Sequence, residues 1–220
     1  MIYLLTIFVG AVVGGLISFV ANKFVIEIDE QVSVSQNKLV GSGCVAGAFL
    51  AVFLFSRFSS WDLLIAYAIL CSGLVMQTII DLLTHRLVRS ITYLMAAVGS
   101  TFLIIHAVRT DKSSSLISAL TCAVVGLVLF LVVNKVSPGG VGLGDVRLVP
   151  VLGWYLGFLG YNEAIWAIFI ACATASVIGL GLVVTGRGSL QRKLAFGPYL
   201  ALGSIVCIFA SQALPSVFLV

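Results

Sequence analysis

Apolar residues fill most of the chain in long runs that short polar segments separate. The runs cover residues 2–25, 39–55, 63–80, 91–108, 116–133, 148–160, 164–184 and 194–220. Most approach the roughly 20 residues that an α-helix needs to cross a bilayer. Backbone groups in lipid must bond within their own segment, so the pattern predicts helices. The sixth run is short and rich in glycine, so it is either sheltered by neighbouring helices or only partly inserted. We predict an all-α, polytopic membrane protein with about eight transmembrane helices.

The composition excludes a soluble protein. The chain is 61% hydrophobic and 9% charged, with a mean hydropathy of +1.21, whereas soluble domains carry about 25% charged residues. A net charge of +4 is too small for a nucleic-acid-binding surface. The first run lacks both a basic start and a cleavage site, which favours a retained helix over a signal peptide. Without repeats or linkers, residues 1–220 are expected to form a single domain.

The basic residues predict the orientation in the membrane. With eight crossings, nine of the twelve fall on one side: Lys23, Lys38, Arg86, Arg89, Lys135, Arg147, Arg187, Arg192 and Lys193. Short cytoplasmic loops carry an excess of Lys and Arg, so this side is predicted to be cytoplasmic. Both termini then lie on the non-cytoplasmic side.

Two aspartates stand at the ends of apolar runs. Asp81 ends the third run in "MQTIIDLLTHRL", and Asp145 precedes the sixth in "GGVGLGDVRLVP". The predicted topology places both at the cytoplasmic rim of the membrane, where partial desolvation makes a carboxylate a candidate functional group. The other six acidic residues are interpreted as solvated loop charges: Glu27, Asp29, Glu30, Asp62, Asp111 and Glu163.

Two carboxylates that meet at one depth would share a proton over part of the pH range. Aspartic proteases use such a pair: the ionised partner activates water, and the protonated partner polarises the scissile carbonyl and later protonates the amine. Gly142 and Gly144 would let a substrate backbone approach, and would permit dihedral angles closed to other residues. The bland alternatives stay open: Asp145 could cap the following helix, and Asp81 could pair with His85 or Arg86.

Three ordered motifs resemble the type IV prepilin peptidases, the Gly-x-Gly-Asp membrane aspartic proteases. "GLGDVRLVPVLGWYLG" at 142–157 is similar to the family's Gly-x-Gly-Asp-x-Lys-Leu signature, with Arg147 in place of the lysine. "IDLLTHRLVRSIT" at 80–92 resembles its other aspartate segment, but Val88 and Arg89 stand where the family commonly has Pro and then Asn or Asp. The third motif, "FGPYLALG" at 196–203, is similar to the start of its last helix. Apart from these three motifs, "GGLISFVANKF" at 14–24 weakly resembles its first helix.

The resemblance implies a cofactor-free protease of the bacterial inner membrane. Asp81 and Asp145 would be the catalytic pair, Gly142 and Gly144 would shape the site, and Arg147 would support it or face phospholipid. The substrates would be type IV prepilins or type II secretion pseudopilins, cut after a glycine that ends a short basic leader. The cut would fall at the cytoplasmic membrane face.

One segment that many members of the family carry is missing. Their cytoplasmic insert binds zinc through two Cys-x-x-Cys pairs, whereas residues 26–38 here form a short loop without cysteine. The chain therefore resembles a short member of the family, and no zinc or other metal site is expected. Many members also methylate the new N-terminus with S-adenosylmethionine. The sequence leaves open whether this chain does so.

Two further alternatives concern charge. Glu27, Asp29 and Glu30 form an acidic cluster on an otherwise basic face, which could steer a basic leader or could simply be solvated.

The rival function is a non-enzymatic membrane transporter or assembly scaffold, in which the two aspartates would bind a cation or a proton. Transporters place such charges near the bilayer midplane, not at its rim. Proteases of the presenilin type pair Gly-x-Gly-Asp with Tyr-Asp and Pro-Ala-Leu, which are not the motifs found here.

Overall fold

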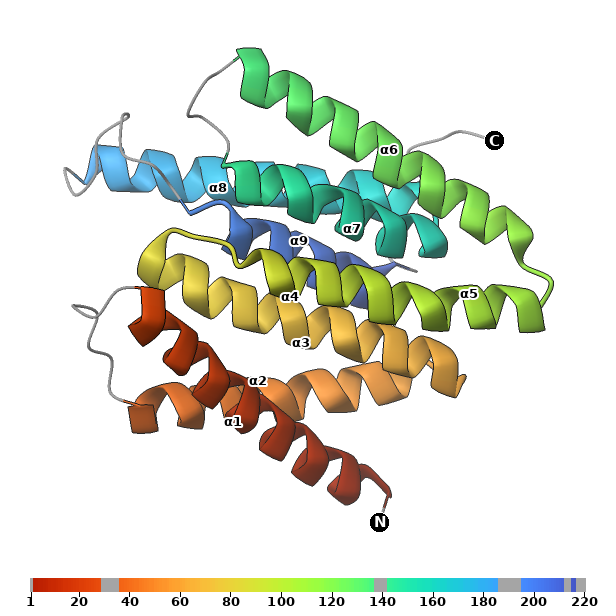
Figure 1. Cartoon of the computed structure of the whole chain (residues 1–220), viewed down its shortest axis with the longest axis horizontal. Helices are drawn as coiled ribbons and strands as arrows, with labels where there is room; N and C mark the ends of the chain where they lie inside the picture. The colour runs from red at the N-terminus through yellow and green to blue at the C-terminus, as the bar shows by residue number, and fades with distance from the viewer. Residues whose placement is uncertain (1, 29–35, 137–141, 186–194, 212–214, 217–220) are drawn as a thin grey trace. The chain divides into compact units, whose positions relative to one another are not determined.

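The computed structural model describes the whole chain except residues 1, 29–35, 137–141, 186–194, 212–214 and 217–220. The described residues are helices joined by short connections, with no strand among them. They fall into two compact units, Met1–His106 and Ala107–Val220. The chain colours of Figure 1 follow the order of the helices through both units.

The described part of unit 1 contains three long helices and a fourth rod made of three helical segments. The long helices are α1 (Ile2–Ile28), α2 (Gln36–Arg57) and α3 (Trp61–Thr84). The rod consists of α4 (Arg89–Leu94), a π-helical turn η1 (Met95–Gly99) and α5 (Ser100–Arg109), within which the boundary of the unit falls. The rod packs on α3, where a side chain at Gly73 would overlap Met95.

Helices α1 and α2 approach each other closely because glycines line both sides of their contact (Figure 1). A Cβ atom at Gly14 would overlap the Gly43 carbonyl oxygen, and one at Gly47 would overlap that of Gly10. Helices in lipid gain stability mainly from close packing, so small residues gather at such crossings. The spacing of four residues in both helices produces this contact.

Unit 2 consists of α6 (Ser113–Val136), α7 (Leu143–Leu159), α8 (Tyr161–Val184) and α9 (Gly197–Ala210). Helices α6 and α7 pack closely, so that a Cβ at Gly157 would lie 2.8 Å from the Ser118 carbonyl oxygen. Ser118 Oγ donates a hydrogen bond of 2.7 Å to the carbonyl oxygen of Gly157. Most side chains of α7 are buried, so the short sixth run is a sheltered helix.

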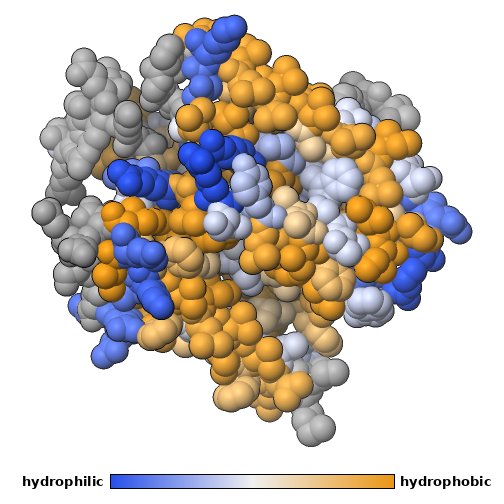
Figure 2. All heavy atoms as spheres, viewed as in Figure 1, coloured by the Kyte–Doolittle hydropathy of each residue, from blue (hydrophilic) through white to orange (hydrophobic). Residues whose placement is uncertain are grey.

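The apolar surface agrees with a membrane location. Large apolar side chains of α1, α6 and α8 are exposed, and apolar atoms cover much of the face in Figure 2. Among the described residues, six helical stretches are long and apolar enough to cross a bilayer: Tyr3–Ile28, Gln36–Arg57, Trp61–Thr84, Arg89–Arg109, Ser113–Val136 and Tyr161–Val184. The all-α membrane fold is thus confirmed. With 17 residues in α7 and 14 in α9, eight crossings and the sides of the termini stay predictions.

Asp62 corrects one expectation. It was interpreted as a solvated loop charge, but its side chain is only 1% exposed in the first turn of α3. Asp62 Oδ1 lies 2.9 Å from His106 Nδ1 and accepts the backbone N–H of Leu63 at 2.9 Å. Amides at a helix N-terminus favour a carboxylate. A histidine 44 positions along the chain completes the pair, which no local pattern could predict.

Candidate active site

Asp81 lies in the last turn of α3, on the buried face of the helix. Its residue is 5% exposed, whereas its neighbour Leu82 is 59% exposed. The buried stripe of α3 contains Leu70, Leu74 and Gln77 at intervals of three or four residues, and Asp81 continues it. The helical period therefore turns the carboxylate away from the lipid-facing side.

Helix α3 ends at Thr84, three residues after Asp81. His85 adopts the left-handed conformation, with φ 51°, and its backbone N–H donates a 2.9 Å hydrogen bond to the Asp81 carbonyl oxygen. A left-handed residue is a common way to end a helix, and histidine tolerates it better than most side chains. The side chains of His85 and Arg86 are exposed, whereas Asp81 is buried.

Gln77 was not singled out from the sequence, although its side chain organises this turn. It is 1% exposed and lies one helical turn before Asp81. Its Nε2 donates to the Val88 carbonyl oxygen at 3.0 Å and to Thr92 Oγ1 at 2.8 Å. Its Oε1 accepts the Val88 N–H at 2.9 Å. The one available signal was an amide in an otherwise apolar stretch close to Asp81.

Asp145 lies at the N-terminal end of a helix, whereas Asp81 lies at a C-terminal end. Helix α7 begins at Leu143, earlier than the apolar run predicted, so Asp145 belongs to its first turn. The residue is 6% exposed, and its Oδ2 accepts the backbone N–H of Gly142 at 3.2 Å. The capping alternative is therefore realised in part. Such a bond also stabilises the charged carboxylate, which a catalytic base requires.

The glycines beside Asp145 act through their missing side chains. Gly142 has φ −71° and ψ 146°, an extended conformation open to any residue, so the expected special dihedral is not used there. A Cβ at Gly142 would instead lie 3.2 Å from Asp145 Oδ2. Gly144 and Arg147 both lie within α7 and are half-buried. Their roles in shaping the site stay predictions.

The other predicted site residues are placed only in part. Glu27 is exposed near the end of α1, whereas Asp29 and Glu30 lie outside the described residues. Within the described ranges, no group of three His, Cys, Asp or Glu side chains could hold a metal ion. Asp81 belongs to unit 1, and Gly142, Gly144, Asp145 and Arg147 belong to unit 2.

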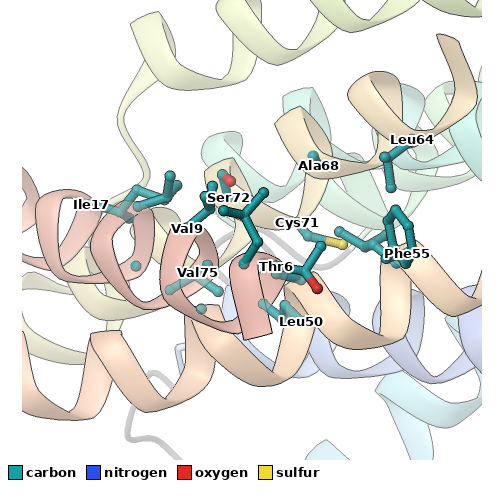
Figure 3. A pocket seen from close by; sticks show the side chains of 17 residues that line it. Thr6, Val9, Ile17, Leu50, Phe55, Leu64, Ala68, Cys71, Ser72 and Val75 are labelled. Carbon is teal, nitrogen blue, oxygen red and sulfur yellow. The ribbon is translucent and has the colours of Figure 1, made fainter. Parts of the chain in front are cut away.

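Apolar cavities accompany the helices of both units. One of about 270 Å³ lies among α1, α2 and α3, where side chains such as Val9, Leu50 and Cys71 converge (Figure 3). A larger one, of about 570 Å³, is lined by α1, α3 and α4. Its wall reaches Met76 and Ile91, on either side of the turn that follows Asp81. In unit 2 a cavity of about 320 Å³ lies among α6 to α9.

Comparison with known proteins assigns a family to these features. Residues 68–182, just over half of the chain, match the type IV leader peptidase family, and the match includes both Asp81 and Asp145. A protein of Bacillus subtilis (strain 168), named prepilin leader peptidase/N-methyltransferase, is 30% identical over 97 residues, which is 44% of this chain and 38% of that protein.

A second relative is longer than this chain as well. The protein of the same name from Burkholderia pseudomallei (strain 1026b) is 31% identical over 177 residues, covering 77% of this chain and 52% of that protein. The chain thus spans about half the length of this relative, and less of the Bacillus protein. No solved structure matches this chain significantly. The family match carries the assignment: this chain belongs to the type IV leader peptidase family.

Proposed function

We propose that this protein is a membrane aspartic endopeptidase of the bacterial inner membrane. It removes the leader of type IV prepilins or type II secretion pseudopilins, cutting after a glycine at the cytoplasmic membrane face. The observation that carries the proposal is that two buried carboxylates, Asp81 and Asp145, lie at the ends of helices α3 and α7 inside the matched family segment. In this proposal the two units bring the carboxylates to opposite sides of one peptide bond.

The positions of the two aspartates support different roles. Asp145 lies in the first turn of α7 and accepts an N–H bond, so its surroundings favour the negative charge. Asp81 lies in the last turn of α3, where the free carbonyl groups of the helix oppose a negative charge. We therefore assign the shared proton of the resting pair to Asp81 and the charge to Asp145.

Hydrolysis then follows from these charges. Asp145 takes a proton from a water molecule as the water oxygen attacks the scissile carbonyl carbon. Asp81 keeps its proton and donates a hydrogen bond through it to the carbonyl oxygen, where negative charge develops. When the tetrahedral intermediate collapses, the C–N bond breaks and the amine nitrogen takes a proton from the pair. The pair keeps the other proton, which restores its starting state.

Other features suit the proposed substrate. The missing side chain of Gly142 leaves room for a backbone beside Asp145. The cavity lined by α1, α3 and α4 offers an apolar wall near Asp81 for the hydrophobic helix that follows the cleaved bond. Glu27, Asp29 and Glu30 would attract the basic leader. Replacing all three by amides should slow cleavage most at low salt, and an unchanged rate would remove this role.

The test is a cleavage assay in membranes against a panel of prepilin-like substrates. Mass measurement of the mature N-terminus locates the cut, and an added methyl group would reveal N-methylation with S-adenosylmethionine. We expect a cut after the last glycine of the leader, without added zinc. A transporter or scaffold would process none of the substrates, and that result would overturn the proposal.

A further inference from the structure

We propose that Gln77 is a positioning residue for Asp81. It holds the turn at residues 85–88 against α3 and thereby fixes the backbone that carries the carboxylate. Only the effect on cleavage rests on the proposed function, because the holding of the turn is a structural claim. All the residues involved belong to unit 1.

The turn is fastened to α3 at two places one helical turn apart. At its start, the His85 N–H bonds to the Asp81 carbonyl oxygen. At its end, both the N–H and the carbonyl of Val88 bond to the side chain of Gln77. The chain has therefore turned back to within a side chain's length of Gln77. The residues between these two bonds pass the level of Asp81.

The hydrogen bonds of Gln77 are buried, so water cannot replace them. Gln77 is 1% exposed and Thr92 is 2% exposed, so neither side chain can exchange its partner for water. The amide of Gln77 uses one oxygen acceptor and both of its Nε2 hydrogens in this arrangement. A buried amide that is satisfied in this way has a single orientation, and the backbone it bonds shares that constraint.

The sequence at position 88 explains why such a fastening is needed. Val88 has φ −83° and ψ 118°, and this φ lies within about 20° of the value that a proline ring imposes. A proline here would fix φ and would present no N–H group. Valine does neither, so its N–H needs an acceptor and its backbone needs an external restraint. Gln77 provides both.

This reading predicts a rescue that a general packing role does not. In Gln77→Met the buried volume is nearly kept, but all three hydrogen bonds of the side chain are lost, two to Val88 and one to Thr92. We expect kcat to fall between about tenfold and about a hundredfold, because small displacements of a catalytic group have effects of this size. KM should change little. In the double variant Gln77→Met with Val88→Pro, most of kcat should return, because proline removes the N–H group that has lost its acceptor and restrains φ at this position.

Two further measurements keep the inference testable. Hydrogen–deuterium exchange of the Val88 amide should speed up in Gln77→Met, whether or not the protein cleaves anything. Asp62→Asn, which weakens the buried pair with His106 at the far end of α3, is the control for lost stability. It should lower the unfolding temperature while leaving kcat near the wild-type value.

The outcomes separate this inference from the proposed function. If wild-type protein cleaves no substrate but the Val88 amide responds as described, the proposed function fails and the fastening of the turn stands. If exchange at Val88 is unchanged in Gln77→Met, the fastening is wrong. If exchange changes but kcat does not, or the double variant is no better than Gln77→Met, Gln77 does not position Asp81.

Discussion

Asp81 and Asp145 are equally buried but are held in different ways. Asp145 sits at the start of α7 and is supported by an amide only three residues away. Asp81 sits at the end of α3, and the turn beside it depends on Gln77 and a partner eleven residues further along. One helix end favours negative charge and the other opposes it. In the proposed mechanism, the same side chain thus takes two chemical roles according to its place on a helix.

The largest expected effect comes from removing either carboxylate. The Asp145→Asn variant lacks the carboxylate that would accept a proton from water, so the cleavage rate should fall by about a thousandfold or more. Asp81→Asn keeps an amide that can still donate a hydrogen bond to the substrate carbonyl, so its loss should be smaller, about a hundredfold. Initial rates in membranes that hold equal amounts of inserted protein measure both. The opposite order of activities would contradict the roles assigned here.

Gly142 allows a smaller test of the support given to Asp145. Gly142→Ala and Gly142→Pro add the same Cβ, 3.2 Å from Asp145 Oδ2, but only proline removes the N–H. The φ of −71° at Gly142 suits proline. Hydrogen bonds to charged groups contribute about 1.5–3 kcal/mol, so Gly142→Pro should cleave at least about tenfold more slowly than Gly142→Ala. Equal rates would mean that this bond does not support catalysis.

The smallest expected effect is on stability, and it comes from the packing of helices within unit 2. A Cβ at Gly157 would press on α6, whereas a Cβ at Gly179 of α8 would meet no atom within 4 Å. Gly157→Ala should therefore lower the stability of unit 2 by about 1–3 kcal/mol. Gly179→Ala should be neutral or slightly stabilising, because alanine favours the helix. Unfolding temperatures in detergent compare the two. A matching loss in both variants would contradict the close contact of α6 and α7.

The sequence predicted best what depends on local pattern. The apolar run at 63–80 marks α3 closely, and Asp145 stood out because a carboxylate interrupts glycines beside an apolar run. The pattern could not predict the π-helical turn at Met95–Gly99, which packs against α3. It also overestimated the last helix, which ends at Ala210.

The sequence did not predict the hydrogen-bond partners of the buried polar side chains. Gln77 bonds a turn eleven residues away, and Asp62 bonds a histidine on another helix. Neither relation leaves a periodic trace in the sequence, because one side chain at each end is sufficient to form it. The carboxylates were found from their positions, but the groups that hold them in place required the three-dimensional structure.

The central claim is that Asp81 and Asp145 meet at one substrate bond. Cysteines at these two positions, in a chain whose five native cysteines are replaced, test it directly in membranes. A disulfide requires Cα atoms within about 7 Å, and a short bifunctional thiol reagent reaches somewhat further. We expect the short reagent to join the two positions, and a membrane-impermeant thiol reagent to label both from the cytoplasmic side. Labelling of the two cysteines from opposite sides of the membrane, with no cross-link between them, would contradict the account.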